Sequence, residues 1–447
     1  FDLDAFVAGK KTSVYTNAPP GFFYYGDPGI PKASTYRRLG DFEPRVGLAW
    51  RAKRNTTIRT AYGIFYQNPP ILYPERFGQV SPFGNTVQLA SPAGGLADPL
   101  QQIGGDPFPF PFPPKKDAAF VAFGTYLNMP LHMHPNYVQQ WNVSVQRQLS
   151  ANWLFTATYL GNKSTHLWLQ NEQNPAVYGP GATTANTNQR RILYRLNPAA
   201  NAGGLVSSIA VADDGGNSHY NGLMLAVNHR FSHNFSGLVN YTWSHCMGSG
   251  DFSSDLFSPQ FQNPYSRQGE YGNCIFDHRQ LFNLSLIAHS PNHYANATLR
   301  RLLGGWEAFV ISSRRTGDFL SLSSGRDNSL TGIGLDRPDV VGDSHVDNPT
   351  LAKYFNTAAF AQNQPGQFGN SGRNSIVGPN QFNIDFGLSR RFKFQESRAL
   401  DVRSEFFNVL NHPNFGNPST SLTNARFGAI TSASDPRILQ FALKFAF

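Results

Sequence analysis

Charged residues are scarce in this chain. Asp, Glu, Lys and Arg together make up 15% of its 447 residues, whereas soluble globular domains carry about a quarter. The formal net charge is +9, but the basic residues are scattered and form only short pairs such as Arg37-Arg38 and Arg390-Arg391. Proteins that bind nucleic acids gather such residues on one face or stripe. The sequence therefore argues against a nucleic-acid partner.

Long apolar runs are missing as well. No stretch approaches the ~18 consecutive apolar residues of a membrane-spanning helix. The mean hydropathy of -0.36 is typical of a soluble protein, but alternating strands of a transmembrane barrel also average to a polar value. Helical periodicity is rare, and Gly and Pro, about one residue in six, interrupt most segments. These absences favour an all-β chain with many turns.

Motifs of common enzyme and metal sites are also absent. The sequence contains no GxSxG, HExxH or Walker A motif, which removes the usual signatures of a serine nucleophile, a zinc protease and a nucleotide site. His132 and His134 share a face if their segment is extended, but no third and fourth ligand is spaced to join them. We therefore predict no catalytic residue, no metal site and no cofactor.

Period-two alternation is the pattern that is present. In residues 382–388 every even position is apolar and every odd position is polar or small. Many segments of this kind run 10 to 14 residues, whereas strands of globular proteins peak at about 5–6 and a tilted bilayer crossing takes about 9–11. We expect eleven strands, at 42–51, 56–66, 137–149, 152–161, 219–231, 234–246, 277–288, 305–316, 380–393, 398–411 and 436–447.

The connections between these strands alternate in length. Short links follow four odd-numbered strands, a somewhat longer one (289–304) follows the seventh, and long loops follow every even-numbered strand. Outer-membrane barrels have this layout, with short turns in the periplasm and long loops outside the cell. We therefore predict an antiparallel transmembrane β-barrel portion. The expected long loops are 67–136, 162–218, 247–276, 317–379 and 412–435.

Alternation also assigns side chains to a lipid side and a lumen side. In the last strand the odd positions 439–447 are all Leu or Phe, as a lipid-facing row requires. The row Asp401, Arg403 and Glu405 has residue types suited to acid–base chemistry, but charges that line a lumen and pair across strands explain it better. The polar residues predicted to face the lumen are Asn383, Asp385, Asp401, Arg403, Glu405, Gln440 and Lys444.

Several long motifs follow one another along the chain. They are FEPRVGLAWR (42–51), TTIRTAYGIFYQ (56–67), YVQQWNVSVQRQLS (137–150), NYTWSHC (240–246), FDHRQLFNLS (276–285), FNTAAF (355–360), GNSGRNSIVGPNQFNIDFGLSRRF (369–392) and VRSEFFNVLNHPNFGNP (402–418). Together these motifs resemble the barrel of Oar-like TonB-dependent outer-membrane receptors, a Gram-negative family expanded in acidobacteria. The resemblance runs from about residue 15 to the end of the chain.

This resemblance implies the C-terminal half of a receptor whose barrel has about 22 strands and a plugged lumen. Residues 1–41 would be an extracellular loop and lead-in, and 42–447 the C-terminal part of the barrel. Nothing in the chain matches the signal peptide, regulatory-like domain, plug or TonB box of the family. The implied location is the cell outer membrane. The implied partners are outer-membrane lipid, the barrel-assembly machinery, the TonB complex acting through the plug, and a small or polymeric solute.

Three further features carry expectations. Phe447, with Phe441, Leu443 and Phe445 behind it, resembles the C-terminal signal by which outer-membrane barrels are recognised for insertion. Cys246 ends one expected strand and Cys274 precedes the next, so we predict a disulfide across the 247–276 loop, with two free thiols as the alternative. In the stretch GGDPFPFPFPP (104–114), rigid aromatic surface suits either ligand contact or a packed loop cap. Its aromatic residues are Phe108, Phe110 and Phe112.

Transport is the function that this pattern favours. We expect a non-enzymatic receptor that binds a large or scarce solute at its extracellular loops and passes it to the periplasm. The alternative is an outer-membrane structural or adhesion protein built from the same β units. An outer-membrane hydrolase finds little support, because no nucleophile motif is present. Saccharides, peptides and siderophore complexes all suit loops rich in aromatic residues, Arg and Asn.

Overall fold

The computed structural model describes residues 1–32, 35–67, 76–84, 97–98, 112–120, 122–250, 261–291, 295–394 and 398–447. In these residues thirteen strands form one sheet, and four short strands form two separate pairs. The strands of the large sheet are β1 (Arg45–Lys53), β2 (Thr56–Tyr66), β3 (Gly124–Asn128), β4 (Tyr137–Gln148), β5 (Trp153–Glu172), β6 (Val206–Ser232), β7 (Phe235–Gly248), β8 (Gly272–Asn273), β9 (Gln280–His289), β10 (Trp306–Arg315), β15 (Gln381–Lys393), β16 (Ala399–Phe407) and β17 (Ile438–Ala446).

The remaining elements are short and lie in the connections. The two small sheets pair β11 (Phe319–Leu320) with β14 (Ile376–Val377), and β12 (Asp339–Val340) with β13 (Phe360–Ala361). The helices are α1 (Leu3–Val7), α3 (Thr187–Arg190), α4 (Ile192–Leu196), α5 (Ala297–Leu303), η2 (Gly203–Leu205), η3 (Gln268–Glu270) and η4 (Thr357–Ala359). In the described part of the chain, no helix combines the length and the apolar character needed to cross a membrane.

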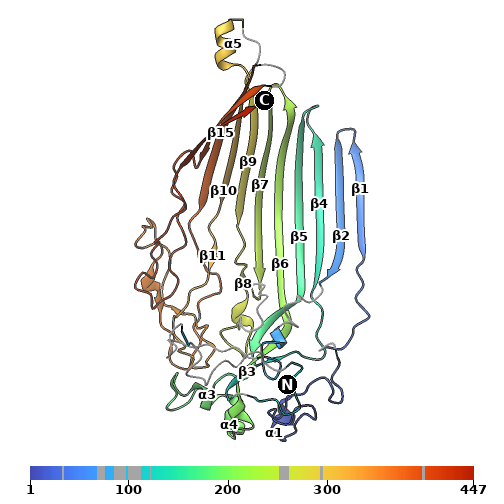
Figure 1. Ribbon diagram of the computed structural model, residues 1–447, viewed down its shortest axis with the longest axis vertical. Helices are drawn as coiled ribbons and strands as arrows, with labels where there is room; N and C mark the ends of the chain where they lie inside the picture. The colour runs from blue at the N-terminus through green and yellow to red at the C-terminus, as the bar shows by residue number, and fades with distance from the viewer. Residues whose placement is uncertain are drawn as a thin grey trace.

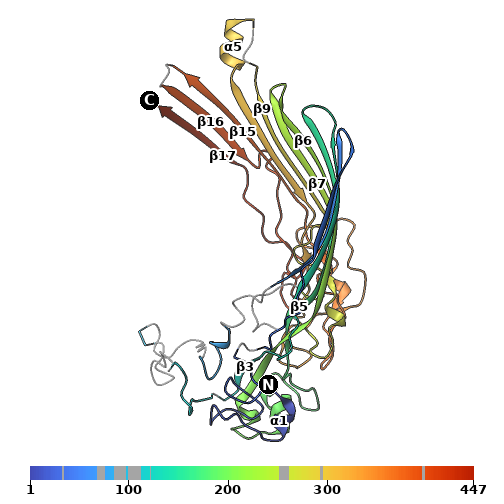
Figure 2. The same ribbon diagram turned by 90° about the vertical axis from the view of Figure 1, so that its right-hand side faces the viewer.

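The eleven strands predicted from alternation are confirmed, and they form the main path of the sheet in chain order. Each of them is antiparallel to the next, while β3 and β8 branch from this path and β3 pairs parallel with β6. Figure 1 shows these strands side by side from β1 to β15, and Figure 2 shows that the sheet curves, with β15, β16 and β17 turned away from β1. The sheet is therefore a curved wall, as a barrel portion requires.

The predicted sorting of connections is confirmed too. Short turns, the helix α5 and the C-terminus lie at one end of the sheet, and the long connections and the N-terminus lie at the other (Figure 1). A short turn joins β1 to β2 at one end, whereas β2 and β4 are joined by a long connection at the opposite end. We call these the turn end and the loop end.

Two strands are longer than the sequence predicted. β5 has 20 residues and β6 has 27, so parts of the expected 162–218 loop are strand. The prediction was wrong there because Asp213-Asp214-Gly215-Gly216-Asn217 has the composition of a turn. In the structure this segment continues the β5–β6 ladder with two register shifts. A Cβ atom at Gly216 would lie 2.7 Å from the Leu167 carbonyl oxygen, so the close approach of the two strands there requires glycine.

The connections at the loop end have hydrophobic cores of their own. One core combines the first residues of the chain with the start of β6, through Phe6, Phe22, Tyr126 and Ile209. A second core lies in the connection between β10 and β15, and it includes Leu322, Phe355 and Phe360. The loop end is thus packed structure, and its first core stands on the extension of β6.

The sheet has one apolar face and one polar face. Directly opposite residues of antiparallel strands share a face, and the register sets Val402 opposite Leu443 and Leu400 opposite Phe445. Large apolar side chains on this face are open to the surroundings: Leu443 is 75% exposed and Trp243 is 58% exposed. A row of such side chains would drive aggregation in water, so it needs lipid to cover it. We call the opposite side the polar face.

Candidate functional site

The polar face collects the residues that the sequence assigned to a lumen. Lys444 lies opposite Asp401, and Gln440 lies opposite Glu405. On the other side of β16, Ser389 lies opposite Arg403. Because positions two apart on a strand share a face, the register places all seven predicted residues on the polar face: Asn383, Asp385, Asp401, Arg403, Glu405, Gln440 and Lys444. That this face borders a lumen remains a prediction.

The charges on this face form open surface pairs. Arg391 Nε lies 3.6 Å from Asp401 Oδ1 across β15 and β16. Arg403 instead reaches along its own strand, with Nη1 3.6 Å from Glu405 Oε1. Both arginine side chains are more than half exposed, and exposed pairs of this kind contribute about 1 kcal/mol or less. These charged pairs therefore add little to stability, and their main effect is to give the polar face charges of both signs.

A hollow of about 540 Å³ opens where the polar face reaches the loop end. It lies over the adjoining strands β9, β10 and β15, at the ends from which the long connections leave. Most of the residues in its wall carry amide, hydroxyl or charged side chains, and apolar side chains lie between them. The residues that line it are Leu281, Asn283, Ser313, Arg314, Arg315, Gln381, Phe382, Asn383, Asp385, Phe407, Asn408, Asn414, Ser434, Asp435, Pro436 and Ile438.

Part of this wall is held by hydrogen bonds. Asp385 Oδ1 accepts the side-chain amide of Asn383 at 2.8 Å and the backbone N–H of Asn408 at 2.9 Å. Asn414 bonds the backbone of Phe382 twice, since its Oδ1 accepts the N–H at 2.7 Å and its Nδ2 donates to the carbonyl at 2.8 Å. The connection after β16 is thereby fixed to the first residues of β15.

Two polar side chains in the hollow are open. Asn283 and Ser313 are exposed, lie directly opposite each other on β9 and β10, and make no side-chain hydrogen bond with a described residue. An amide and a hydroxyl together offer donors and acceptors without a fixed charge. The hollow can therefore hydrogen-bond a polar solute.

Arg315 supplies a partly neutralised cation at the edge of the hollow. Its Nη1 donates to Asp318 Oδ1 at 2.7 Å, and the same guanidinium nitrogen lies 2.7 Å from His278 Nε2. Burial by itself would raise the pKa of Asp318, but hydrogen bonds from Asn417 and Arg315 outweigh it and lower that pKa. Asp318 thus keeps its negative charge beside Arg315.

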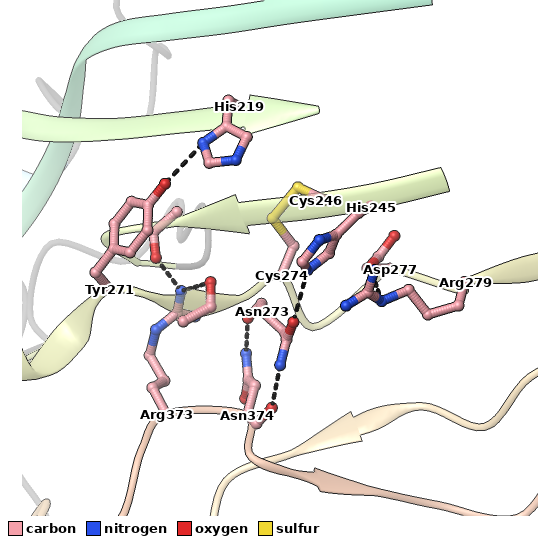
Figure 3. The surroundings of a disulfide bond; sticks show 12 residues. His219, His245, Cys246, Tyr271, Asn273, Cys274, Asp277, Arg279, Arg373 and Asn374 are labelled. Carbon is pink, nitrogen blue, oxygen red and sulfur yellow. Dashed lines mark hydrogen bonds and ion pairs between the residues drawn. A yellow bond between two sulfur atoms is a disulfide. The ribbon is translucent and has the colours of Figure 1, made fainter. Parts of the chain in front are cut away.

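The predicted disulfide is present at the loop end of β7. Cys246 and Cys274 are joined across a separation of 28 residues, and the Cys274 N–H donates to the Cys246 carbonyl at 3.1 Å. Figure 3 shows the surroundings of the bond, where His245 Nε2 lies 2.9 Å from Asn273 Oδ1. Asn273 and Asn374 each donate a side-chain amide to the other's carbonyl. The disulfide segment is thus tied to the connection between β10 and β15.

A buried ion pair makes a second tie between the same segments. Arg337 Nη1 lies 2.7 Å from Glu270 Oε2, and the two side chains are 7% and 1% exposed. Arg337 also donates to the Gly269 carbonyl at 2.8 Å, while the N–H of Gln262 donates to Glu270 Oε1 at 3.2 Å. Each charge is therefore paired within the loop end, as buried charges must be.

Asp277 is a buried carboxylate with few partners. Its side chain is 1% exposed, and Oδ2 has no hydrogen bond within the described residues. Arg279 Nε is 3.8 Å away, beyond hydrogen-bond reach (Figure 3). Burial raises the pKa of Asp277, although a hydrogen bond from the Cys246 N–H and nearby cationic side chains oppose the rise.

The other residues singled out in the sequence have varied positions. Phe108 and Phe110 lie outside the described residues, and Phe112 is 79% exposed. Phe441, Leu443 and Phe445 lie on the apolar face of β17, and the C-terminus that follows lies at the turn end (Figure 1). The roles proposed for these residues in ligand contact and assembly remain predictions.

Sequence reasoning missed the residues that complete the hollow. Asn408 and Asn414 fall in a connection, and Ser313 lies in a strand whose alternation is weak. The one usable signal was the asparagine at every third position, 408, 411 and 414, at the end of the expected strand 398–411. That signal gives no partner strand, so it could not place these side chains together.

Comparison with known proteins places the chain among outer-membrane proteins. A family model described as an outer membrane beta barrel domain matches residues 1–440. No protein with a curated description matches the sequence.

Solved structures of outer-membrane transporters and receptors are similar at low identity. The outer membrane transporter YddB from Escherichia coli is 10% identical over 91% of this chain and 40% of its own, with a TM-score of 0.46. The FrpB iron transporter from Neisseria meningitidis is 10% identical over 91% of this chain and 39% of its own, at 0.41. The ferripyoverdine receptor of Pseudomonas aeruginosa is 9% identical over 92% and 34%, at 0.43. This chain therefore spans two fifths or less of the length of these proteins.

Proposed function

The chain belongs to the outer membrane beta barrel domain family and lies in the outer membrane, and from that premise we propose that it is the C-terminal part of an Oar-like TonB-dependent receptor. In this proposal residues 42–447 form barrel wall, and 1–41 form an extracellular loop and lead-in. The receptor binds a large or scarce solute at its loop end and passes it to the periplasm. It makes no covalent change in the solute.

The observation that carries this proposal is the difference between the two faces of the sheet. The apolar face exposes Leu and aromatic side chains, as contact with lipid requires. The polar face carries a hollow at the loop end, where the side chains of Asn283 and Ser313 are open. A transporter needs such a polar path beside a lipid-covered wall, whereas an adhesin does not.

The partners follow from the same proposal. Outer-membrane lipid covers the apolar face. The barrel-assembly machinery recognises the terminal row that ends in Phe447, with Phe441, Leu443 and Phe445 behind it. The TonB complex of the inner membrane acts through a plug domain of the complete receptor and supplies the work of transport.

Uptake by living cells tests this proposal. A strain that lacks the full-length gene and a restored strain are grown in complex medium, and depletion of solutes from the medium is followed by mass spectrometry. We expect at least one solute to be depleted only by the restored strain, and its depletion to stop when the TonB complex is removed. Changed surface attachment with no change in uptake would overturn the transport proposal and favour an adhesive role.

A pair of matched variants tests the site within that experiment. Ser313→Trp fills the hollow, and Ser389→Trp places the same bulk elsewhere on the polar face. We expect Ser313→Trp to slow depletion of the identified solute and Ser389→Trp to leave it near the wild-type rate. Equal rates for the two variants would remove the hollow from the transport path.

A further inference from the structure

Two imidazoles and a carboxylate from three separate segments meet at the loop end of β5 and β6. One potential ligand atom from each of His134, His166 and Asp214 lies within 4.8 Å of the other two. They lie beyond the level at which β4 ends, because Tyr137 is the first residue of β4 and pairs with Thr165. The cluster is therefore outside the lipid-covered wall.

Hydrogen bonds fix how these rings are oriented. His134 Nδ1 lies 2.7 Å from Asp214 Oδ2, and the backbone N–H of His134 donates to the same oxygen at 2.7 Å. His166 Nδ1 lies 3.1 Å from the Asp214 carbonyl oxygen. A carbonyl oxygen only accepts, so His166 Nδ1 carries the proton and the Nε2 of the neutral ring has a free lone pair.

The same reasoning applies to His134, since a carboxylate also only accepts. The two rings stack with their centroids 4.5 Å apart and 14° between their planes. Neither Nε2 atom has a hydrogen-bond partner within the described residues. A metal ion can take the place of the proton on each Nδ1 atom, because that proton can move to the free Nε2 atom of the same ring. The ion then joins the two rings and Asp214 where hydrogen bonds join them now.

The backbone at the cluster departs from regular strand. His166 has φ of 60°, a value uncommon for a residue other than glycine, and it lies at a register shift between Thr165 and Leu167. Asp214 lies at the facing irregularity of β6. Bulges re-aim side chains, and here they bring His166 and Asp214 to the same place.

The neighbouring side chains leave the cluster free to bind an ion. Asp213 is already paired, with Arg267 Nη2 2.6 Å from its Oδ1, and Asp214 is the residue that contacts both imidazoles. The side chain of His134 is 46% exposed and that of Asp214 is 26% exposed, which gives access from solution. Trp168 Nε1 donates to the His134 carbonyl at 2.7 Å and holds that segment against β5.

We propose that His134, His166 and Asp214 form a binding site for a divalent transition-metal ion, with zinc as the best fit to two imidazoles and a carboxylate. Zinc binds His nitrogen and Asp oxygen at about 2.0–2.2 Å, which sets tetrahedral ligand atoms about 3.4 Å apart. The ligand atoms now lie within 4.8 Å of one another, so their separations must change by up to about 1.4 Å to reach that spacing. Magnesium and calcium prefer all-oxygen sites and fit poorly.

Ion binding releases any proton on the ring nitrogen that becomes a ligand, and a fourth position remains for water or for a donor atom of a solute. The bound ion joins the segment before β4 to the extensions of β5 and β6. The proposal does not depend on transport, so the site stands or falls separately from the function proposed above.

Titration of the 447-residue chain with zinc tests the site. The protein is folded in detergent without a histidine tag, and zinc binding is measured by calorimetry, with cobalt absorption as a report of coordination by nitrogen and oxygen. We expect one saturable zinc site, no binding of magnesium, and a loss of affinity of at least about tenfold in His166→Ala and in Asp214→Asn. His132→Ala is the matched control, because His132 packs on Tyr36 with centroids 4.9 Å apart and lies outside the cluster.

Two results would overturn the proposal. One is the absence of saturable zinc binding, which would leave the cluster as a hydrogen-bonded loop contact only. The other is zinc binding that survives unchanged in both His166→Ala and Asp214→Asn. Heat-modified migration in electrophoresis reports whether each variant is folded, and His166→Gln replaces His166→Ala if the latter does not fold.

Discussion

The buried pair of Glu270 and Arg337 allows a sharp test of how the loop end is held. Glu270→Gln keeps the shape of the side chain and removes its charge. Arg337 then remains in a site where its side chain is 7% exposed, with the Gly269 carbonyl and a neutral amide as partners. Its Nε atom has no hydrogen-bond partner within the described residues even in the wild type, so no spare acceptor is at hand.

The cost follows from the burial of that cation. Removing one member of a buried ion pair destabilises by about 3–5 kcal/mol, because the other charge is left uncompensated. We expect that cost to appear as easier local opening of the loop end, since the ion pair joins η3 to the connection between β10 and β15. Amide exchange in 261–276 should accelerate by about two to three and a half powers of ten.

Hydrogen exchange followed by mass spectrometry measures this change on the protein in detergent, with peptides from β9 and β10 as internal controls. The double variant Glu270→Gln with Arg337→Met removes both charges and should recover most of the loss, because an apolar replacement of a whole buried pair is often neutral. If Glu270→Gln changes exchange by less than about tenfold, the pair is not buried as the structure has it. If the double variant is worse than the single one, the cost does not come from an unpaired charge.

Three further predictions concern the loop end and the chain terminus. Cys246→Ser should make the loop that the disulfide closes more sensitive to protease. The disulfide spans 28 residues, and a cross-link over a loop of that length stabilises the folded state by about 3–4 kcal/mol. Equal cleavage rates of the wild type with and without reductant would contradict this prediction. Burial raises the pKa of Asp277 above its usual 3.8, so the folded loop binds the carboxyl proton more tightly than the unfolded loop does. The contribution of Asp277 to stability therefore falls as pH rises from 3.8 through the raised value. Amide exchange rates in 272–279 should show less of this pH dependence in Asp277→Asn, and identical profiles for the variant and the wild type would refute the raised pKa. Phe447→Ala should lower the fraction of chains that assemble in the outer membrane, measured by heat-modified migration, whereas Ala446→Ser should not; equal assembly of the two variants would remove the terminal aromatic from the signal.

The sheet was predictable because its signal is local. Each strand carries its own alternation, and alternation is imposed by contact with different surroundings on the two faces. Residues 382–388 therefore predicted both a strand and its faces, and the observed register confirms that Asn383 and Asp385 share a face with Asp401. The pairing of strands such as β1 with β2 and β6 with β7 followed because a short turn leaves only an antiparallel neighbour within reach.

The candidate sites were less predictable because their residues come together through the register of distant segments. Asn283 and Ser313 meet because β9 and β10 pair with those two residues opposite each other, and neither strand encodes that register alone. The histidines illustrate the same limit: the sequence paired His132 with His134, whereas the structure sets His134 against His166. Residues 213–217 fell within the expected loop 162–218, and it is the long-range ladder with β5 that makes them part of a strand.

In the receptor proposed above, the length of β6 determines where a solute is first met. Residues 206–217 of β6 extend beyond Ser218, which pairs with the last residue of β7, and at about 3.3 Å per residue they span up to roughly 40 Å. That reach is comparable to the thickness of a bilayer with its headgroups, whereas the electrostatic influence of a charged membrane surface decays within about 8–10 Å in physiological salt. The tips of the loop end therefore stand outside the electrostatic field of the lipid, and their preference among neutral, anionic and cationic solutes is set by their own side chains at any lipid composition.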